Sequence, residues 1–262
     1  MILRIKASFS RDFKSTPYVK NKTYSYSLEG KEFKIELNNW AEQANGSVLV
    51  RLGDTMVLAT AVMNKIPKEG GDFFPLTVDY EEKFYAAGKI LGSRFVKRET
   101  RPSEEAILVD RLIDRSIRPR FDMRMRNEVQ VVVTVLSIDD QNDPDIPSLL
   151  AASLALSLSD IPWQGPIAAV RVGEKDGKFV LNPLYEDRGG FDLDLVISGT
   201  KDRINMIEAG ADEISEEKFF EAVDWGYKFL KELINFQKSI ISENQKEKAD
   251  IKTFEAPKEL RA

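Results

Sequence analysis

One apolar segment, Glu128–Ile138 with VVVTVL at its centre, constrains the fold of this chain more than any other. The β-branched residues of this run favour a strand. Because apolar residues follow one another almost without interruption, the run predicts a central strand that is buried on both faces. We therefore expect a sheet in the core of the domain.

Further short strands and tight turns surround this segment. Gly53-Asp54 separates two apolar runs, Ser47–Leu52 and Thr55–Val62, and Asp176-Gly177 separates two more, which predicts two hairpins. The expected strands are Lys34–Leu37, Ser47–Leu52, Thr55–Val62, Glu128–Ile138, Ile167–Val172, Lys178–Leu181, Phe191–Ser198 and Ile204–Glu208. Residues 65–101, with several prolines and glycines, form the least regular long stretch.

Three helices are expected between and after these strands. Ser103 can cap the first, which Pro119 ends. Pro147–Ser159, rich in Leu, Ala and Ser, predicts a second, buried helix, and Ser215 can cap a third that runs from about Glu216 to Ser242. Strand clusters interleaved with a few helices indicate an α+β fold with a mixed β-sheet and packed helices.

The chain ends differ in composition from the middle. Residues 1–24 are basic, which predicts a flexible extension or, as an alternative, a transit peptide. Residues 25–242 form the expected domain, and residues 243–262 are polar, as in a linker or the start of a helical segment. No apolar run is long enough for a membrane span, so no membrane partner is expected.

Composition limits the chemistry. The chain has 262 residues, 42% of them hydrophobic, with no cysteine and no histidine. This excludes thiol nucleophiles and every Ser-His or Cys-His arrangement, and leaves carboxylates, Lys, Arg, Ser, backbone amides or a carboxylate-held cation. The absence of cysteine fits a cytoplasmic location. The net charge of −5 does not by itself favour a nucleic-acid binder.

Basic residues nevertheless gather in two places. Arg111, Arg115 and Arg118 share one helix face, where they can bind phosphate or, alternatively, form structural ion pairs such as Asp114 with Arg118. The segment Arg94-Phe95-Val96-Lys97-Arg98 places an aromatic among three cations, which suits single-stranded RNA. An ordinary basic loop is the alternative.

Two aspartates are a third candidate. Asp192 and Asp194 share one face of a strand and could hold Mg²⁺ for phosphoryl transfer. A polar strand face opposite an apolar one is the alternative that the pattern favours.

Together these segments resemble the polynucleotide phosphorylase (polyribonucleotide nucleotidyltransferase) family. The resemblance is collinear from about Ser25 to Ile241. It is carried by QANGSVLVR (Gln43–Arg51), GDTMVLATAV (Gly53–Val62), DFFPLTVDYEEKFYAAGKI (Asp72–Ile90), KRETRPSEEAILVDRLIDRSIRPRF (Lys97–Phe121), NEVQVVVTVLSID (Asn127–Asp139), DIPWQGPIAAVRVG (Asp160–Gly173) and DLDLVISGTKD (Asp192–Asp202).

The resemblance implies a fold and an assembly. The family's subunit has two RNase PH-type domains, a helical segment and C-terminal RNA-binding domains, and this chain is similar to the first RNase PH-type domain. The implied core is of the ribosomal protein S5 domain 2-like class. The implied assembly is a homotrimeric ring around an RNA channel, acting in mRNA degradation. The whole enzyme would use inorganic phosphate and Mg²⁺ to release nucleoside diphosphates from the RNA 3′ end.

The resemblance also assigns roles to residues. The family's second domain carries the catalytic serine pair, aspartates and lysine. Pro144 and Asp145 stand here near the serine pair, Arg188 replaces an aspartate, Val196 replaces the lysine, and Asp194 alone matches. A degenerate site that binds no metal is therefore expected, with Mg²⁺ confined to the second domain.

The family's first domain grips RNA with a loop of two aromatics and two basic residues. Phe95, Lys97 and Arg98 match that loop, Val96 replaces the second aromatic, and Arg94 and Arg101 add cations. Two other functions remain open: a stand-alone RNase PH-like nuclease, and an oligomerisation module that binds no RNA.

Overall fold

The VVVTVL segment forms the middle of strand β6 (Asn127–Ser137) in the computed structural model, which describes residues 22–38, 40–68, 70–90 and 101–255. β6 belongs to a six-stranded sheet in the order β1-β2-β3-β4-β6-β5. It pairs antiparallel with β4 (Thr55–Pro67) and parallel with β5 (Leu76–Glu82). The expected mixed sheet is therefore confirmed.

The expectation that this strand is buried on both faces is wrong. Alternate residues Val129, Val131, Val133 and Val135 are buried, whereas Gln130 is exposed and the residues between the other valines are only half-buried. The reason is that helices cover one face of the sheet only, as the contacts of α1 (Glu104–Ile117) and α2 (Asp145–Leu158) show. A β-branched side chain on the open face satisfies strand propensity without requiring burial.

The meander that opens the domain has the expected turn. β1 (Lys22–Leu28), β2 (Lys31–Leu37) and β3 (Gly46–Leu52) run antiparallel, and β3 pairs with β4 so that Leu52 faces Thr55. Gly53 makes this turn with φ +61°, a conformation that glycine adopts without steric cost.

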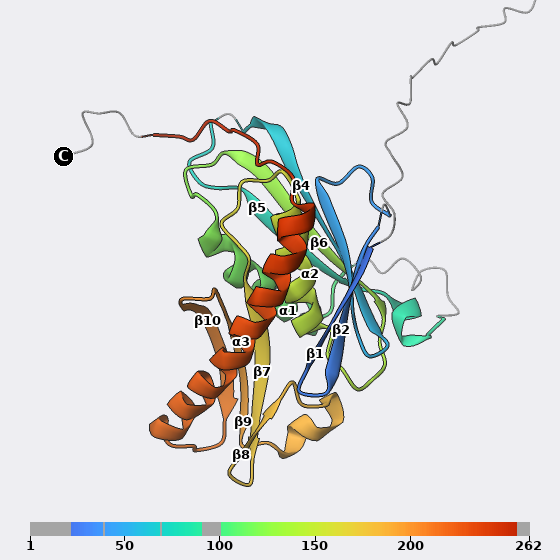
Figure 1. Ribbon diagram of the computed structural model, residues 1–262, viewed down its shortest axis with the longest axis vertical. Coiled ribbons are helices and arrows are strands. Elements are labelled where there is room, and N and C mark those ends of the chain that lie inside the picture. The colour runs from blue at the N-terminus through green and yellow to red at the C-terminus, as the bar shows by residue number, and fades with distance from the viewer. Residues whose placement is uncertain (1–21, 39, 69, 91–100, 256–262) are drawn as a thin grey trace, which may run out of the picture.

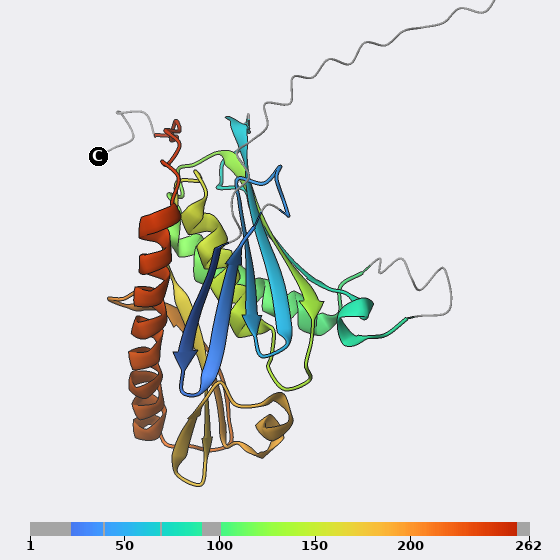
Figure 2. The ribbon, with the colours of Figure 1, turned by 45° about the vertical axis from the view of Figure 1, so that its right-hand side comes forward.

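The stretch expected to be least regular contains a strand. In β5, Leu76, Val78 and Tyr80 are buried and alternate with more exposed residues. A short 3₁₀ helix, η1 (Phe84–Ala87), follows it and projects at one side of the molecule in Figure 2.

The three helices form as predicted. Ser103 caps α1 by accepting a hydrogen bond from the Ala106 amide at 3.0 Å, and Ser215 caps α3 (Glu216–Asn244) by accepting one from the Lys218 amide at 3.3 Å. A 3₁₀ turn, η3 (Arg118–Arg120), contains Pro119 and ends the first helix. Every residue of α2 is buried.

A second sheet lies on the other side of α1 and α2. Its strand order is β10-β9-β7-β8, all antiparallel, with β7 (Ala168–Lys175), β8 (Lys178–Leu181), β9 (Leu193–Gly199) and β10 (Ile204–Ala211). The 3₁₀ helix η4 (Tyr185–Gly190) connects β8 to β9. Helix α2 contacts β3 and β4 of the first sheet and β7 of the second, so the helix pair lies between the sheets (Figure 1).

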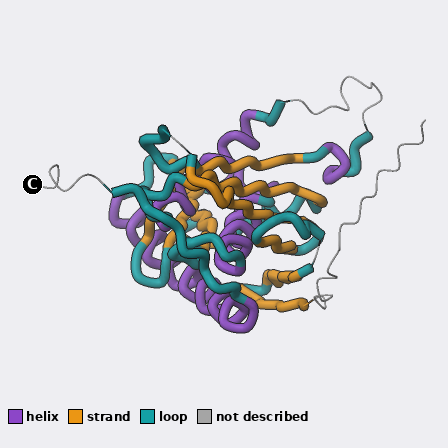
Figure 3. The backbone as a smooth tube through the Cα atoms, turned by 90° about the horizontal axis from the view of Figure 1, so that it is seen from above, coloured by secondary structure: helices purple, strands orange, loops and turns teal. Residues whose placement is uncertain are grey.

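Helix α3 forms the outermost layer. It packs on β7 and β9, and its other end reaches the first sheet, where the Phe236 ring stacks on Tyr26 at 5.0 Å. Helix and strand layers follow one another in the view from above (Figure 3). No helix among the described residues is long and apolar enough to span a membrane.

The chain after α3 is held against the core. The Ala249 amide donates to the Asp160 carbonyl at 2.7 Å, and the Lys248 ammonium donates to three carbonyls at the C-terminal end of α2. The segment expected to be a polar linker, 243–262, is described to residue 255: residues 243 and 244 end α3, and residues 245–255 pack on the domain.

Candidate functional site

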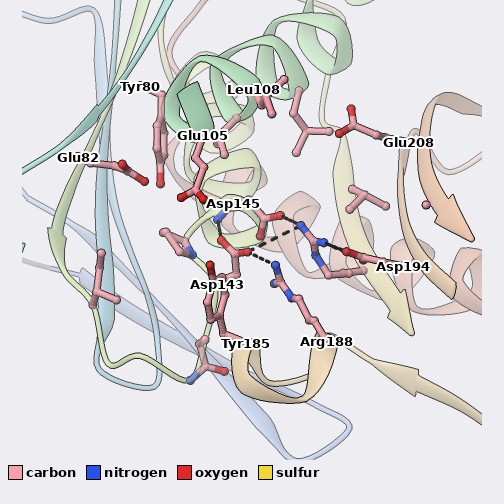
Figure 4. A pocket seen from close by; sticks show the side chains of 18 of the residues that line it. Tyr80, Glu82, Glu105, Leu108, Asp143, Asp145, Tyr185, Arg188, Asp194 and Glu208 are labelled. Carbon is pink, nitrogen blue, oxygen red and sulfur yellow. Dashed lines mark hydrogen bonds and ion pairs between the residues drawn. The ribbon is translucent and has the colours of Figure 1, made fainter. Parts of the chain in front are cut away.

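An open cavity of about 700 Å³ lies between α1 and the second sheet. Helix α1 and β5 supply one wall, β9 and β10 supply another, and the chain before α2 and η4 close the remaining side (Figure 4). The topology brings these elements together because α1 packs on β5 and also contacts β10.

All five residues that the resemblance assigns to a degenerate site line this cavity. Pro144 and Asp145 begin α2, Arg188 lies on η4, and Asp194 and Val196 lie on β9. These positions are up to 52 residues apart in sequence, so the fold alone brings them together. Asp192, the other aspartate of the predicted pair, does not line the cavity.

Three carboxylates in the cavity converge on one guanidinium group. Arg171 on β7 donates from Nη1 to both oxygens of Asp194, at 2.7 and 2.6 Å, and from Nη2 to Asp145. The Asp143 carboxylate lies 3.8 Å from Nη2 of Arg171 and also pairs with Arg188. Figure 4 shows this chain of ion pairs crossing the floor of the cavity.

The same aspartates occupy the amino end of α2. The Asp143 carboxylate accepts the Asp145 amide at 3.2 Å, and the Asp145 carboxylate accepts the Ile146 amide at 2.6 Å. Free amides and the helix dipole make such a helix end a site for anions. Here the chain's own carboxylates use that site, so it does not offer these amides to an external phosphate.

Burial sets the protonation behaviour of this network. Asp143 is buried and close to Asp145, and both effects raise the pKa of the Asp143 carboxyl. Burial disfavours the charged form of Arg171, but the Asp145 and Asp194 carboxylates outweigh it and raise the guanidinium pKa. Arg171 therefore stays charged, and removing it would leave buried carboxylates without their counter-charge.

The carboxylates do not form a metal site as they stand. No group of three acidic side chains within residues 22–38, 40–68, 70–90 and 101–255 is arranged to hold a metal ion. Asp145 and Asp194, the two that a cation would need, already bind the Arg171 guanidinium. The residues therefore do not fit a bound Mg²⁺.

Three polar atoms around the cavity have no hydrogen-bond partner within the described chain: the Tyr80 hydroxyl and the Nε atoms of Arg171 and Arg188. Tyr80 is 3% exposed, and burial, together with the nearby Glu82 charge, raises the pKa of its phenol. The hydroxyl thus remains protonated at neutral pH, and among the described residues its oxygen has neither a donor nor an acceptor as partner.

The predicted arginine face of α1 proves to be divided. Arg118 pairs with Asp114, as predicted, and also donates to the Leu76 carbonyl at 3.1 Å. Arg115 forms an exposed ion pair with Glu208 at 3.3 Å, and Arg111 is exposed. The apolar residues on the opposite face of α1 are only partly packed into the core: Leu112 and Ile117 are buried, but Ile107 and Leu108 are exposed.

The predicted RNA-binding loop is mostly outside the described residues: Arg94, Phe95, Lys97 and Arg98 fall within 91–100. Arg101 is described and exposed. η1, which precedes the loop, is anchored to the sheet because the Ala86 carbonyl accepts the Ile138 amide at 3.0 Å.

Sequence reasoning missed several residues of the cavity, above all Arg171 and Tyr80. An arginine inside the apolar strand IAAVRVG is a signal for a buried ion pair, since a buried charge needs a partner. The alternation of Leu76, Val78 and Tyr80 is the corresponding signal for β5.

The βαβα layering and the cavity between the layers define a class of domain, the RNase PH-type core. Two family models confirm this: 3′ exoribonuclease family, domain 1, matches residues 29–162, and 3′ exoribonuclease family, domain 2, matches residues 165–228. The chain belongs to the 3′ exoribonuclease family.

The curated relatives agree. The chain is 52% identical over 237 residues to the polyribonucleotide nucleotidyltransferase of Bacillus cytotoxicus, and 52% identical over 239 residues to that of Anoxybacillus flavithermus. These matches cover 90% and 91% of this chain but 33% and 34% of the relatives, so the chain spans about a third of their length.

Solved structures share the fold. Rice Rrp46 superposes with a TM-score of 0.62 at 14% identity, covering 85% of this chain and 94% of that one. A chain of the Archaeoglobus fulgidus exosome, solved with RNA bound to the active site, gives a TM-score of 0.61 at 23% identity, with coverages of 77% and 86%.

Proposed function

We propose that this chain is the RNA-guiding, non-catalytic first core domain of a phosphorolytic 3′→5′ exoribonuclease that acts in mRNA degradation in the cytoplasm. In the whole enzyme, inorganic phosphate attacks the terminal phosphodiester and releases a nucleoside diphosphate, in a step that is reversible as polymerisation. A second RNase PH-type domain supplies the phosphate site and the Mg²⁺ ligands, and three copies form a ring around the RNA.

The observation that carries the non-catalytic role is the state of the cavity. Phosphorolysis needs a place for the phosphate anion and cationic stabilisation of the charge that develops on it. Asp143 and Asp145 occupy the helix amides that would bind an anion, and Arg171 occupies the carboxylates that would bind a cation. Among the described residues, the helix amides and the aspartates at the floor of the pocket are therefore already engaged with one another and with Arg171, which supports a site without ligands for the reaction.

The RNA-guiding role rests on the cations and the aromatic of residues 94–101. Bases stack on aromatic rings, and Lys or Arg side chains follow the phosphates, so this composition suits a single strand without sequence preference. The family assignment and the exosome relative solved with RNA support this role.

A phosphorolysis assay tests the non-catalytic part of the proposal. The 262-residue chain is incubated with single-stranded RNA, phosphate and Mg²⁺, and nucleoside diphosphate release is measured; we expect none above background. Release that depends on Asp194 would establish the stand-alone nuclease instead.

RNA affinity is then measured over a range of salt concentrations. Lys97→Ala combined with Arg98→Ala should weaken binding and reduce the magnitude of the salt slope by about 1.4, since each single-strand phosphate contact contributes about 0.7. The matched control, Lys228→Ala with Lys238→Ala on α3, removes two exposed cations and should leave affinity and slope unchanged. Wild-type behaviour of the loop variant would favour the oligomerisation module.

A further inference from the structure

The cavity keeps an excess of negative charge after its internal ion pairs are counted. Seven carboxylates and three cations line it. Arg171 and Arg188 already pair with Asp143, Asp145 and Asp194. The carboxylates of Glu82 and Glu105 stand at one end and are exposed; Glu82 accepts the Ser103 hydroxyl at 3.0 Å, and neither carboxylate has an ion-pair partner among the described residues. Glu208, at the other end, pairs with the exposed Arg115 at 3.3 Å, and the described residues give it no other ion-pair partner.

Tyr80 gives an independent indication of a ligand. Its side chain lines the same cavity and is 3% exposed, and its hydroxyl has no hydrogen-bond partner in the described structure. Figure 4 shows the hydroxyl directed into the cavity, on the side where Glu82 and Glu105 lie. A buried hydroxyl without a partner is unfavourable, and a ligand N–H that donates to the hydroxyl oxygen would relieve part of that penalty.

One wall of the cavity is apolar. Leu108 is 60% exposed at this wall, where Val109 and Leu112 of α1 also line the cavity. In Figure 4 Leu108 lies between the Glu82–Glu105 end and Glu208. Carboxylates at two ends with aliphatic surface between them match a ligand that has cationic ends and an aliphatic middle.

We propose that this cavity binds an aliphatic di- or polyamine, with one ammonium group at Glu82, Glu105 and the Tyr80 hydroxyl, and another near Glu208. The methylene chain lies on Leu108. An inorganic divalent cation fits less well, since the acidic groups of the described residues are not arranged as a metal site. An anion is disfavoured by the net charge of the lining.

The test is calorimetric titration of the 262-residue chain with spermidine at constant ionic strength. We expect saturable binding of one spermidine per chain, weakened at least tenfold by Glu82→Gln with Glu105→Gln. The matched control is Glu216→Gln with Glu217→Gln, which removes two acids from the equivalent first turn of α3 and should leave the affinity unchanged. Equal weakening by both pairs would show diffuse counter-ion attraction and overturn the proposal.

A second variant distinguishes spermidine binding at this site from non-specific attraction to acidic side chains. Tyr80→Phe removes only the hydroxyl oxygen, so it should weaken spermidine binding severalfold while the thermal midpoint stays the same or rises. Unchanged affinity in Tyr80→Phe would remove the hydroxyl from the site and contradict the assignment. Inorganic phosphate is titrated in parallel, and binding of phosphate that Arg171→Met abolishes would identify an anion pocket and likewise refute an amine.

Discussion

Replacing Arg171 by methionine tests the central feature of the cavity. The arginine side chain is 13% exposed and contacts Asp145, which is 1% exposed, and Asp194, which is 40% exposed. Methionine keeps most of the aliphatic volume but removes the charge. Deleting one partner of a buried ion pair costs about 3–5 kcal/mol, because the remaining charge stays buried without a partner. We expect a loss near 3 kcal/mol, since Asp194 can still reach solvent.

The loss should depend on pH in a defined direction. The guanidinium charge of Arg171 lowers the pKa of the Asp143 carboxyl, which burial already raises, so without it this folded-state pKa rises further above its unfolded value. A raised carboxyl pKa means that the folded state binds more protons, so stability falls as pH increases through that range. The difference between Arg171→Met and wild type should therefore be largest at pH 7.5 and shrink towards pH 5.

Urea unfolding followed by tryptophan fluorescence measures this difference. The control is Arg115→Met, which breaks an exposed pair whose side chains are 55% and 50% exposed, and should cost under about 1 kcal/mol. A cost below about 1 kcal/mol for Arg171→Met, or a loss that is the same at pH 5 and pH 7.5, would refute the reasoning about a buried, internally neutralised network.

Two further predictions concern residues outside the network. Burial and the neighbouring Asp79 raise the pKa of Asp110 from 3.8 to about 6, so ionised Asp110 destabilises the fold as pH rises from about 4 through 6. The pKa shift corresponds to about 3 kcal/mol of unfolding free energy, which solvent screening of this partly exposed group reduces to about 1 kcal/mol. Asp110→Asn should therefore stabilise the chain by about 1 kcal/mol at pH 7.5 and give no gain at pH 4, as urea unfolding at both pH values will measure. Lys248→Met removes three hydrogen bonds to α2 carbonyls and should cost about 1–2 kcal/mol. It should also speed hydrogen exchange at the Ala249 amide, and unaltered exchange there would show that Lys248 does not hold the segment.

Local signals in the sequence sufficed for the turns and helix ends. Gly53-Asp54 and Asp176-Gly177 predict their hairpins because few residues adopt the required backbone angles, and Ser103 and Ser215 predict helix starts because the cap is a contact within one turn. These features depend on residues close together in the chain, so they can be predicted before any tertiary contact is known.

The open face of β6 and the ion-pair network could not be predicted in this way. Whether Val132 is covered depends on which face the helices choose, and nothing within VVVTVL encodes that choice. The partners of Arg171 lie 26 and 23 residues away, on α2 and β9. Family resemblance identified Asp145, Arg188 and Val196 as departures from the family pattern and Asp194 as a match, but it did not indicate that a strand arginine would pair with the aspartates.

If the domain carries out no reaction of its own, as we propose, Arg171 supplies a physical reason for a cavity of this shape to persist in it. Carboxylates gathered between two sheets repel one another, and a diffusible cation stabilises them only in proportion to its concentration relative to its dissociation constant. A guanidinium carried on β7 is always present, and its geometry satisfies two carboxylates at once. The same permanence fits the proposed non-catalytic role, because a tethered cation whose two Nη atoms are paired with carboxylates cannot exchange ligands as a bound metal ion does. An arginine at this strand position thus joins the second sheet to α2 by fixed ion pairs, and it does so by occupying the ligands that a metal-dependent reaction would need.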